Sequence, residues 1–218
     1  MEIEREIKIK VCGMRDAENI QRVASLSPDY LGFIFYSKSP RFVGNDFKIP
    51  ADLHPGIQRV GVFVNESTQF IRAKAKSAGF TVVQLHGNES PDQAAALKDS
   101  GLNIIKVFSV GDDFNFTVTK PYEKSSDYFL FDTKGKLYGG NAKTFNWNIL
   151  NQYDQEVPFF LSGGLSPENL EGIKDLHHMN IHALDLNSGV EISPGLKDPI
   201  KIQQTQQLTH HFWRKPTT

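Results

Sequence analysis

Cysteine is nearly absent from this chain, because Cys12 is the only one among 218 residues. A single cysteine cannot form an intrachain disulfide. The sequence also lacks the clusters of cysteine and histidine that hold structural zinc. We therefore expect neither a disulfide framework nor a metal site.

An excess of charge of one sign and long apolar runs are missing too. The formal net charge is -1, with 24 Lys and Arg against 25 Asp and Glu, so no basic surface for nucleic acid is expected. No segment approaches the roughly 18 consecutive apolar residues of a membrane span. Residues 1–5 are too charged for a secretory signal. Since 39% of residues are hydrophobic, we expect a soluble, cytoplasmic, globular α/β protein.

What the sequence does contain is a series of short apolar runs rich in β-branched and aromatic residues. The eight runs cover residues 7–11, 30–35, 59–64, 81–85, 103–108, 128–131, 157–161 and 182–186. Most are continuous, which is typical of parallel strands covered by helices. The pattern predicts a (β/α)8 TIM barrel that forms a single domain over residues 1–218. A doubly wound open sheet is the alternative, but no Gly-x-Gly-x-x-Gly follows the first run.

Helix signals lie between most of these runs. Asp16, Ser90 and Ser166 each stand where a helix is expected to begin, and proline follows directly after the two serines. Gly79 and Gly101 stand where two of the helices are expected to end. Residues 47–55, between the second and third runs, have only a weak helix signal.

A thiol and a carboxylate stand at the ends of two predicted strands. Active sites of (β/α)8 barrels lie at the carboxyl ends of the strands. Cys12 directly follows the first run and Asp132 directly follows the sixth. They are therefore candidates for a base and an acid that face one substrate. Two alternatives remain: a free cysteine is commonly a small buried apolar residue, and Asp132 could cap a helix or order a loop. The glycine-containing loop 133–144 is expected to close over substrate.

Glycine-rich turns follow the seventh and eighth runs. Gly163 and Gly164 follow the seventh, just before the helix expected at Ser166, and Ser188 and Gly189 follow the eighth. Loops after these two strands are the usual phosphate site of such barrels, because backbone amides there bind an anion. The alternative is a pair of ordinary tight turns.

Three further polar residues follow or lie within strands and could contact a ligand. Arg41 suits bidentate pairing with a carboxylate or phosphate, although a solvated surface arginine is common. His86 could contact a ligand or satisfy neighbouring backbone. Asp185 could orient a substrate hydroxyl or accept from backbone donors.

Eight sets of motifs occur in one order along residues 8–200. They are 10–13 (KVCG), 32–35 (GFIF) with 39–43 (SPRFV), 61–65 (GVFVN), 84–87 (QLHG), 131–132 (FD) with 139–140 (GG), 143–147 (KTFNW), 161–165 (LSGGL) and 185–191 (DLNSGVE). In this combination the chain resembles the phosphoribosylanthranilate isomerases, the tryptophan-pathway enzymes of the (β/α)8 class.

The resemblance implies an Amadori rearrangement of N-(5-phosphoribosyl)anthranilate. By match to the family motifs, Asp132 would be the general acid that protonates the furanose oxygen. Cys12 would be the general base that removes the C2′ proton of the resulting Schiff base. Arg41 would hold the anthranilate carboxylate, and residues 163–164 and 188–189 would hold the phosphate. Because only internal proton transfer is involved, no cofactor is expected. The expected partner is a small phosphosugar substrate, bound by a monomer or homodimer without nucleic acid or membrane.

The sequence departs from the family pattern at three places. Asn187 stands where serine is usual, Ser162 replaces an alanine, and residues 141–142 (Asn-Ala) replace a Thr-Gly pair in the loop. The first two concern the predicted phosphate contacts. The third is expected to stiffen the loop, since alanine lacks the backbone freedom of glycine. None removes the predicted acid or base.

Two other functions compete with this interpretation. The histidine-pathway sugar isomerase performs the same rearrangement on a phosphate-binding barrel. That enzyme uses two aspartates, whereas this chain has Cys12 after the first strand. A non-catalytic phosphosugar-binding protein would keep the phosphate loops alone. The presence of both Cys12 and Asp132 argues against it.

Overall fold

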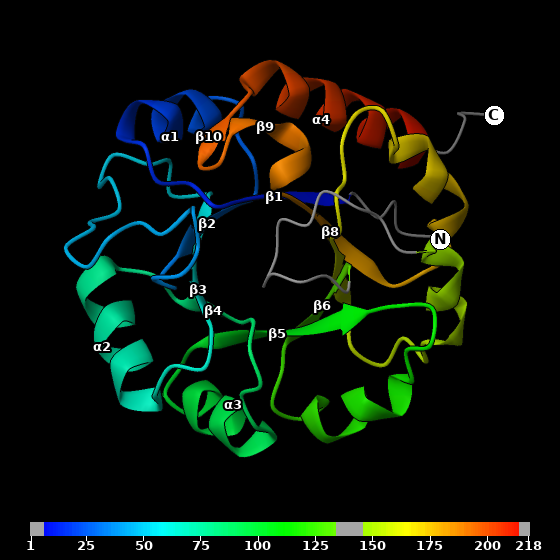
Figure 1. Cartoon of the computed structure of the whole chain (residues 1–218), viewed down its shortest axis with the longest axis horizontal. Coiled ribbons are helices and arrows are strands. Elements are labelled where there is room, and N and C mark those ends of the chain that lie inside the picture. The colour runs from blue at the N-terminus through cyan, green and yellow to red at the C-terminus, as the bar shows by residue number, and fades with distance from the viewer. Residues whose placement is uncertain (1–6, 134–145, 214–218) are drawn as a thin grey trace.

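Eight parallel strands close into a barrel in the computed structural model, which describes residues 7–133 and 146–213. The strands are β1 (Lys8–Cys12), β2 (Tyr30–Ile34), β3 (Gln58–Phe63), β4 (Val82–Leu85), β5 (Asn103–Val110), β6 (Tyr128–Thr133), β7 (Phe159–Leu161) and β8 (Ile181–Leu186). Each pairs with its sequence neighbours, and β1 closes the ring by pairing with β8. Figure 1 shows the strands as a central ring with helices around it.

The helices that cover the barrel differ in kind around the ring. The α-helices are α1 (Ala17–Ala24), α2 (Thr68–Ala78), α3 (Pro91–Lys98) and α4 (Pro199–Trp213). Tighter 3₁₀ helices are η1 (Phe116–Tyr122), η2 (Trp147–Gln152), η3 (Leu170–Leu176) and η4 (Ser188–Val190). A hairpin of β9 (Glu191–Ser193) and β10 (Leu196–Lys197) follows η4. The predicted (β/α)8 barrel is confirmed, and the open-sheet alternative is wrong.

The predicted helix ends are confirmed where the capping side chain bonds to its own helix. The Asp16 carboxylate accepts from the Asn19 amide at 2.8 Å, and the Ser90 hydroxyl accepts from the Gln93 amide at 3.2 Å. Each bond satisfies one amide that the first helical turn leaves without a partner. Gly79 ends α2 in the left-handed region, with φ of 73°.

The helix predicted after Ser166 forms and carries Leu170 and Ile173, but its predicted start is wrong. The helical segment there is η3, and it starts only at Leu170. The reason is the side chain of Asn169, whose Oδ1 accepts from the Ser166 amide at 3.0 Å and whose Nδ2 donates to the Gly164 carbonyl at 2.8 Å. These bonds fix a loop and leave the Ser166 hydroxyl without a capping role. In the described segment 35–57, where the helix signal is weak, no helix forms.

Apolar side chains form one layer inside the barrel and one outside it, because successive side chains of a strand point to opposite faces. One layer fills the space between strands and helices and includes Val11, Leu31 and Phe33. The other fills the barrel interior with Cys12, Tyr30, Ile34, Val60, Val62, Val82, Ile105, Val107, Leu130, Phe160 and Ala183.

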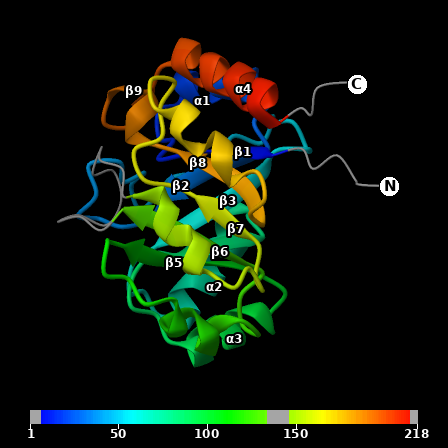
Figure 2. The ribbon, with the colours of Figure 1, turned by 90° about the vertical axis from the view of Figure 1, so that its right-hand side faces the viewer.

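The side view places β9 at the end of the barrel toward which the strand arrows of β5 point (Figure 2). This is the carboxyl end of the strands, where sites are built in such barrels. Within the described residues no helix is both long and apolar enough to cross a membrane.

Candidate active site

A cavity of about 510 Å³, including its open mouth, lies at the carboxyl ends of the strands. The described residues that line it are Cys12, Ile34, Tyr36, Val62, Val64, Gln84, His86, Asp132, Ser162, Gly164, Asp185, Asn187 and Ser188. Polar groups from distant parts of the sequence therefore meet over an apolar floor.

Six of the nine predicted site residues line this cavity: Cys12, His86, Asp132, Gly164, Asp185 and Ser188. The other three, Arg41, Gly163 and Gly189, are not among the described lining residues, although each glycine is adjacent in sequence to a residue that is.

Cys12 ends β1 with its thiol at the cavity wall, and only 3% of the residue is exposed. Gly32 of the neighbouring strand makes room for it, because a Cβ there would lie 2.8 Å from the Cys12 Sγ. Burial raises the pKa of the thiol above its usual value. The cationic side chains of Lys10 and Lys197 oppose this effect. The thiol is thus mostly protonated at neutral pH.

Asp132 is the second-last residue of β6, with one carboxylate oxygen bonded to the backbone and the other facing an imidazole. Its Oδ1 accepts from the Thr133 amide at 2.9 Å, and its Oδ2 lies 3.5 Å from His86 Nε2. The Gln84 amide donates to His86 Nδ1 at 2.9 Å. In a neutral imidazole that leaves the proton on Nε2, the ring nitrogen 3.5 Å from Asp132 Oδ2. His86 therefore lies beside the carboxyl group at the cavity.

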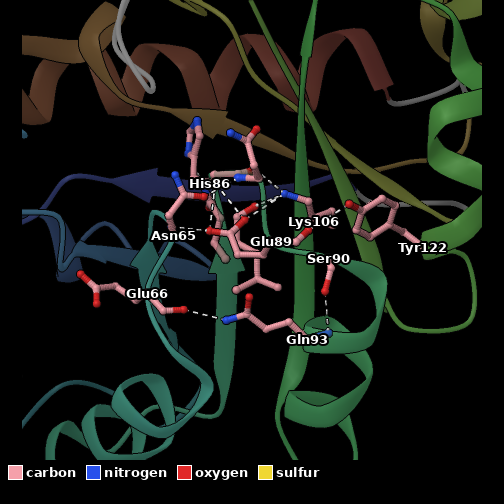
Figure 3. Close-up of polar contacts among 12 residues, drawn as sticks. Asn65, Glu66, His86, Glu89, Ser90, Gln93, Lys106 and Tyr122 are labelled. Atoms are coloured by element: carbon pink, nitrogen blue, oxygen red, sulfur yellow. Dashed lines mark hydrogen bonds and ion pairs between the residues drawn. The ribbon is translucent and has the colours of Figure 1, made fainter.

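The loop that carries His86 is held by a buried ion pair (Figure 3). Lys106 Nζ lies 3.0 Å from Glu89 Oε2 and donates to the Gly87 carbonyl at 2.7 Å. Glu89 also accepts from the amides of Asn65 at 2.8 Å and Gly87 at 2.9 Å. Because Glu89 is 2% exposed, these bonds replace water almost completely.

We expect Glu89→Gln to destabilise the protein by about 3 kcal/mol, because Lys106 would remain buried without its counter-ion. The measurement is urea unfolding. Glu171→Gln is the matched control, since the Glu171–Lys174 pair has the same 3.0 Å separation but is exposed. That variant should lose far less stability, because water screens an exposed ion pair. Equal losses in the two variants would contradict the role assigned to burial.

Arg41 already has a carboxylate partner within the chain. Its Nε and Nη2 donate to the two oxygens of Glu191 at 2.8 and 2.6 Å. Lys197, fully buried, donates to Glu191 at 2.6 Å and to Asn187 Oδ1 at 2.7 Å. Burial lowers the pKa of Lys197 to about 8, and Glu191 opposes that shift. This cluster ties the end of β8 to the β9–β10 hairpin.

Four residues of the site were not predicted from the sequence: Lys10, Gln84, Glu191 and Lys197. A lysine inside an apolar strand, such as Lys10, is the one signal that could have been recognised, because a fully buried lysine needs a partner. Its Nζ lies 2.7 Å from Asp185 Oδ1. Gln84 Oε1 is buried and has no hydrogen-bond partner among the described residues.

The loops after β7 and β8 lie against each other. A Cβ at Gly189 would lie 2.1 Å from the Leu165 carbonyl oxygen, so glycine is required for this approach. Gly164 has φ of 69°, in the left-handed region. Since no helix begins at Ser166, any anion here would meet loop amides rather than the start of that helix.

Part of the predicted site lies outside the described residues. This holds for most of the loop 133–144, for the motif glycines 139–140 and for the 141–142 departure. Among the residues that are described, no three His, Cys, Asp or Glu side chains group so that they could hold a metal ion.

Comparison with known proteins identifies the family. The protein-family model described as N-(5'phosphoribosyl)anthranilate (PRA) isomerase matches residues 9–207 of this chain. An N-(5'-phosphoribosyl)anthranilate isomerase of Parabacteroides distasonis is 44% identical over an alignment of 211 positions, and the alignment covers 93% of each chain.

Solved structures agree with these matches. Phosphoribosyl anthranilate isomerase from Thermotoga maritima has a TM-score of 0.82 at 30% identity, covering 94% of this chain and 99% of its own. Another phosphoribosyl anthranilate isomerase, solved in complex with reduced 1-(o-carboxyphenylamino)-1-deoxyribulose 5-phosphate, has a TM-score of 0.79 at 28% identity over the same shares. The chain belongs to the N-(5'-phosphoribosyl)anthranilate isomerase family.

Proposed function

We propose that this chain converts N-(5-phosphoribosyl)anthranilate to 1-(2-carboxyphenylamino)-1-deoxyribulose 5-phosphate in tryptophan biosynthesis. The observation that carries the proposal is that a thiol and a carboxyl group, on Cys12 and Asp132, line one cavity from strands β1 and β6. Family membership supports the same reaction.

In the proposed mechanism the two groups act in sequence. Asp132 donates a proton to the furanose ring oxygen, the C1′–O bond breaks, and a Schiff base forms between C1′ and the anthranilate nitrogen. Cys12 as thiolate then removes the proton from C2′, and the electron pair forms the C1′–C2′ double bond of an enolamine. Tautomerisation of the enolamine gives the ketone product.

The two anionic ends of the substrate need separate anchors. We assign the phosphate to the loops that contain Gly163, Gly164, Ser188 and Gly189, and the anthranilate carboxylate to Arg41. The pair with Glu191 uses Arg41 Nε and Nη2, so Nη1 is the part of the guanidinium outside that pair. His86 and Asp185 would contact the ribose portion. The product analogue bound in a relative has the same two anionic ends.

The test is consumption of freshly prepared phosphoribosylanthranilate, followed by the loss of its fluorescence. Turnover supports the proposal. Binding without turnover would instead favour a phosphosugar-binding protein. Turnover of the histidine-pathway aminoaldose alone would favour that rival isomerase.

A phosphate site at the two loops predicts that inorganic phosphate stabilises the protein and competes with substrate. At roughly ten to a hundred times its Kd, phosphate should add about 1–3 kcal/mol to the free energy of unfolding. Gly164→Val should abolish both effects, because valine fills the approach to the loop amides. The measurements are Tm and the apparent KM with and without phosphate.

Gly101→Val is the matched control for backbone strain. Gly101 also has positive φ, 88°, and a Cβ there meets nothing within 4 Å. Both variants should lose about 1–2 kcal/mol of stability, while only Gly164→Val loses the response to phosphate. If phosphate changes neither Tm nor KM in the wild type, the loops are ordinary turns.

A further inference from the structure

A fully buried ammonium group lies inside the barrel on the same strand as Cys12. Lys10 is 0% exposed, and its Nζ lies 2.7 Å from Asp185 Oδ1, on a residue that is 5% exposed. The two residues are aligned across the β1–β8 pair, so both side chains stand in one layer of the interior. A charge pair this deep persists only with close partners.

Lys10 is also a neighbour of the cavity thiol. Lys10 and Cys12 are two residues apart on β1, and side chains at that spacing point to the same face of a strand. Burial lowers the pKa of Lys10, but the charges of Asp185 and then Cys12 raise it above its usual value. The ammonium group therefore has a bound carboxylate and, two residues along the same face of the strand, the thiol as its neighbours.

The charged groups that act on Cys12 come from three strands. Lys10 on β1 and Lys197 on β10 favour the thiolate, while Asp185 on β8 opposes it. Burial of the thiol also opposes ionisation. Of the two cations, Lys10 has the larger effect on the pKa of the thiol.

We propose that Lys10 is a positioning residue that holds positive charge beside Cys12 and so favours the thiolate form of that cysteine. Asp185 keeps the ammonium protonated and in place. The consequence for turnover rests on the proposed function, because it requires Cys12 to be the base. The effect of Lys10 on the ionisation of the thiol does not rest on the proposed function. The alternative is that Lys10 only balances the buried charge of Asp185.

The experiment is a pH titration of the thiolate by its ultraviolet absorbance, with Cys12→Ser as the blank. Cys12 is the only cysteine, so the signal belongs to one group. Lys10→Met should move the midpoint up by about one pH unit or more, the size expected when an adjacent opposite charge is removed. Lys10→Arg, which keeps the charge, should restore most of the shift. An unchanged or lower midpoint in Lys10→Met would overturn the proposal.

A second comparison does not depend on the folding of Lys10→Met, which leaves Asp185 without its counter-ion. Asp185→Asn alone should lower the midpoint, and Lys10→Met combined with Asp185→Asn should raise it above that of Asp185→Asn. If these two variants titrate alike, Lys10 has no influence on the thiol and the proposal fails.

Turnover separates this proposal from the proposed function. In the wild type, kcat/KM should rise with pH because the base must be ionised, and Lys10→Met should move that limb up by the same shift as the thiol midpoint. If the wild type has no turnover but Lys10→Met shifts the thiol midpoint, the role of Lys10 holds and the isomerase function is rejected. If the wild type turns over substrate but Lys10→Met leaves the midpoint unchanged, the isomerase function holds and the role of Lys10 is rejected.

Discussion

Cys12→Ser should lower kcat by about 10²-fold or more while the product still binds. A serine hydroxyl is far less acidic than a thiol, so it cannot supply the anionic base near neutral pH. Serine is also close in size to cysteine, and Gly32 leaves space at this position. The measurements are steady-state turnover of phosphoribosylanthranilate and the Kd of the product.

The control for Cys12→Ser is the product affinity and the Tm of the same variant. Unchanged product affinity and Tm would show that the barrel and the cavity are intact. Activity within about threefold of the wild type would remove Cys12 from the mechanism, because loss of an acid–base group has much larger effects.

Asp132→Asn should lower kcat by about 10²- to 10⁴-fold with little change in KM. Asparagine has the same shape, and its carbonyl oxygen can still accept from the Thr133 amide that bonds Asp132 at 2.9 Å. It cannot donate the carboxyl proton, so ring opening becomes limiting. Steady-state kinetics with freshly prepared substrate measure the effect.

Asp127→Asn is the matched control, because Asp127 directly precedes β6 and lies at the amino end of the barrel strand that ends near Asp132. Its carboxylate accepts from the Ile104 amide at 2.8 Å, far from the cavity lining. The same change of charge there should alter stability and leave kcat near its wild-type value. A rise in KM with unchanged kcat in Asp132→Asn would make Asp132 a binding residue, and the acid would lie elsewhere.

The barrel could be predicted because its signals are local. Continuous apolar runs mark strands covered on both sides, and the caps at Asp16 and Ser90 act within four residues of themselves. Position then follows from topology, since residues that end parallel strands gather at one edge. That is why Cys12 and Asp132 could be predicted from the sequence to face one cavity.

The local signal for a helix start failed at Ser166, where another side chain bonds to the backbone of the same turn. Ser166 has the sequence of a helix cap, but Asn169 bonds to the Ser166 amide and the Gly164 carbonyl. With these groups bonded to Asn169, the residues before Leu170 form a turn, and η3 begins at Leu170. No spacing rule in the sequence distinguishes these two outcomes.

The sequence alone determined the fold and the strand ends at which chemistry is expected. Only the tertiary structure decided which charges meet. Lys10 and Asp185 are 175 residues apart, and Arg41 and Glu191 are 150 apart. Both pairs form because β1 closes on β8 and brings the hairpin beside the first loops. Burial then makes each pairing obligatory, since an isolated charge inside the barrel would cost several kcal/mol.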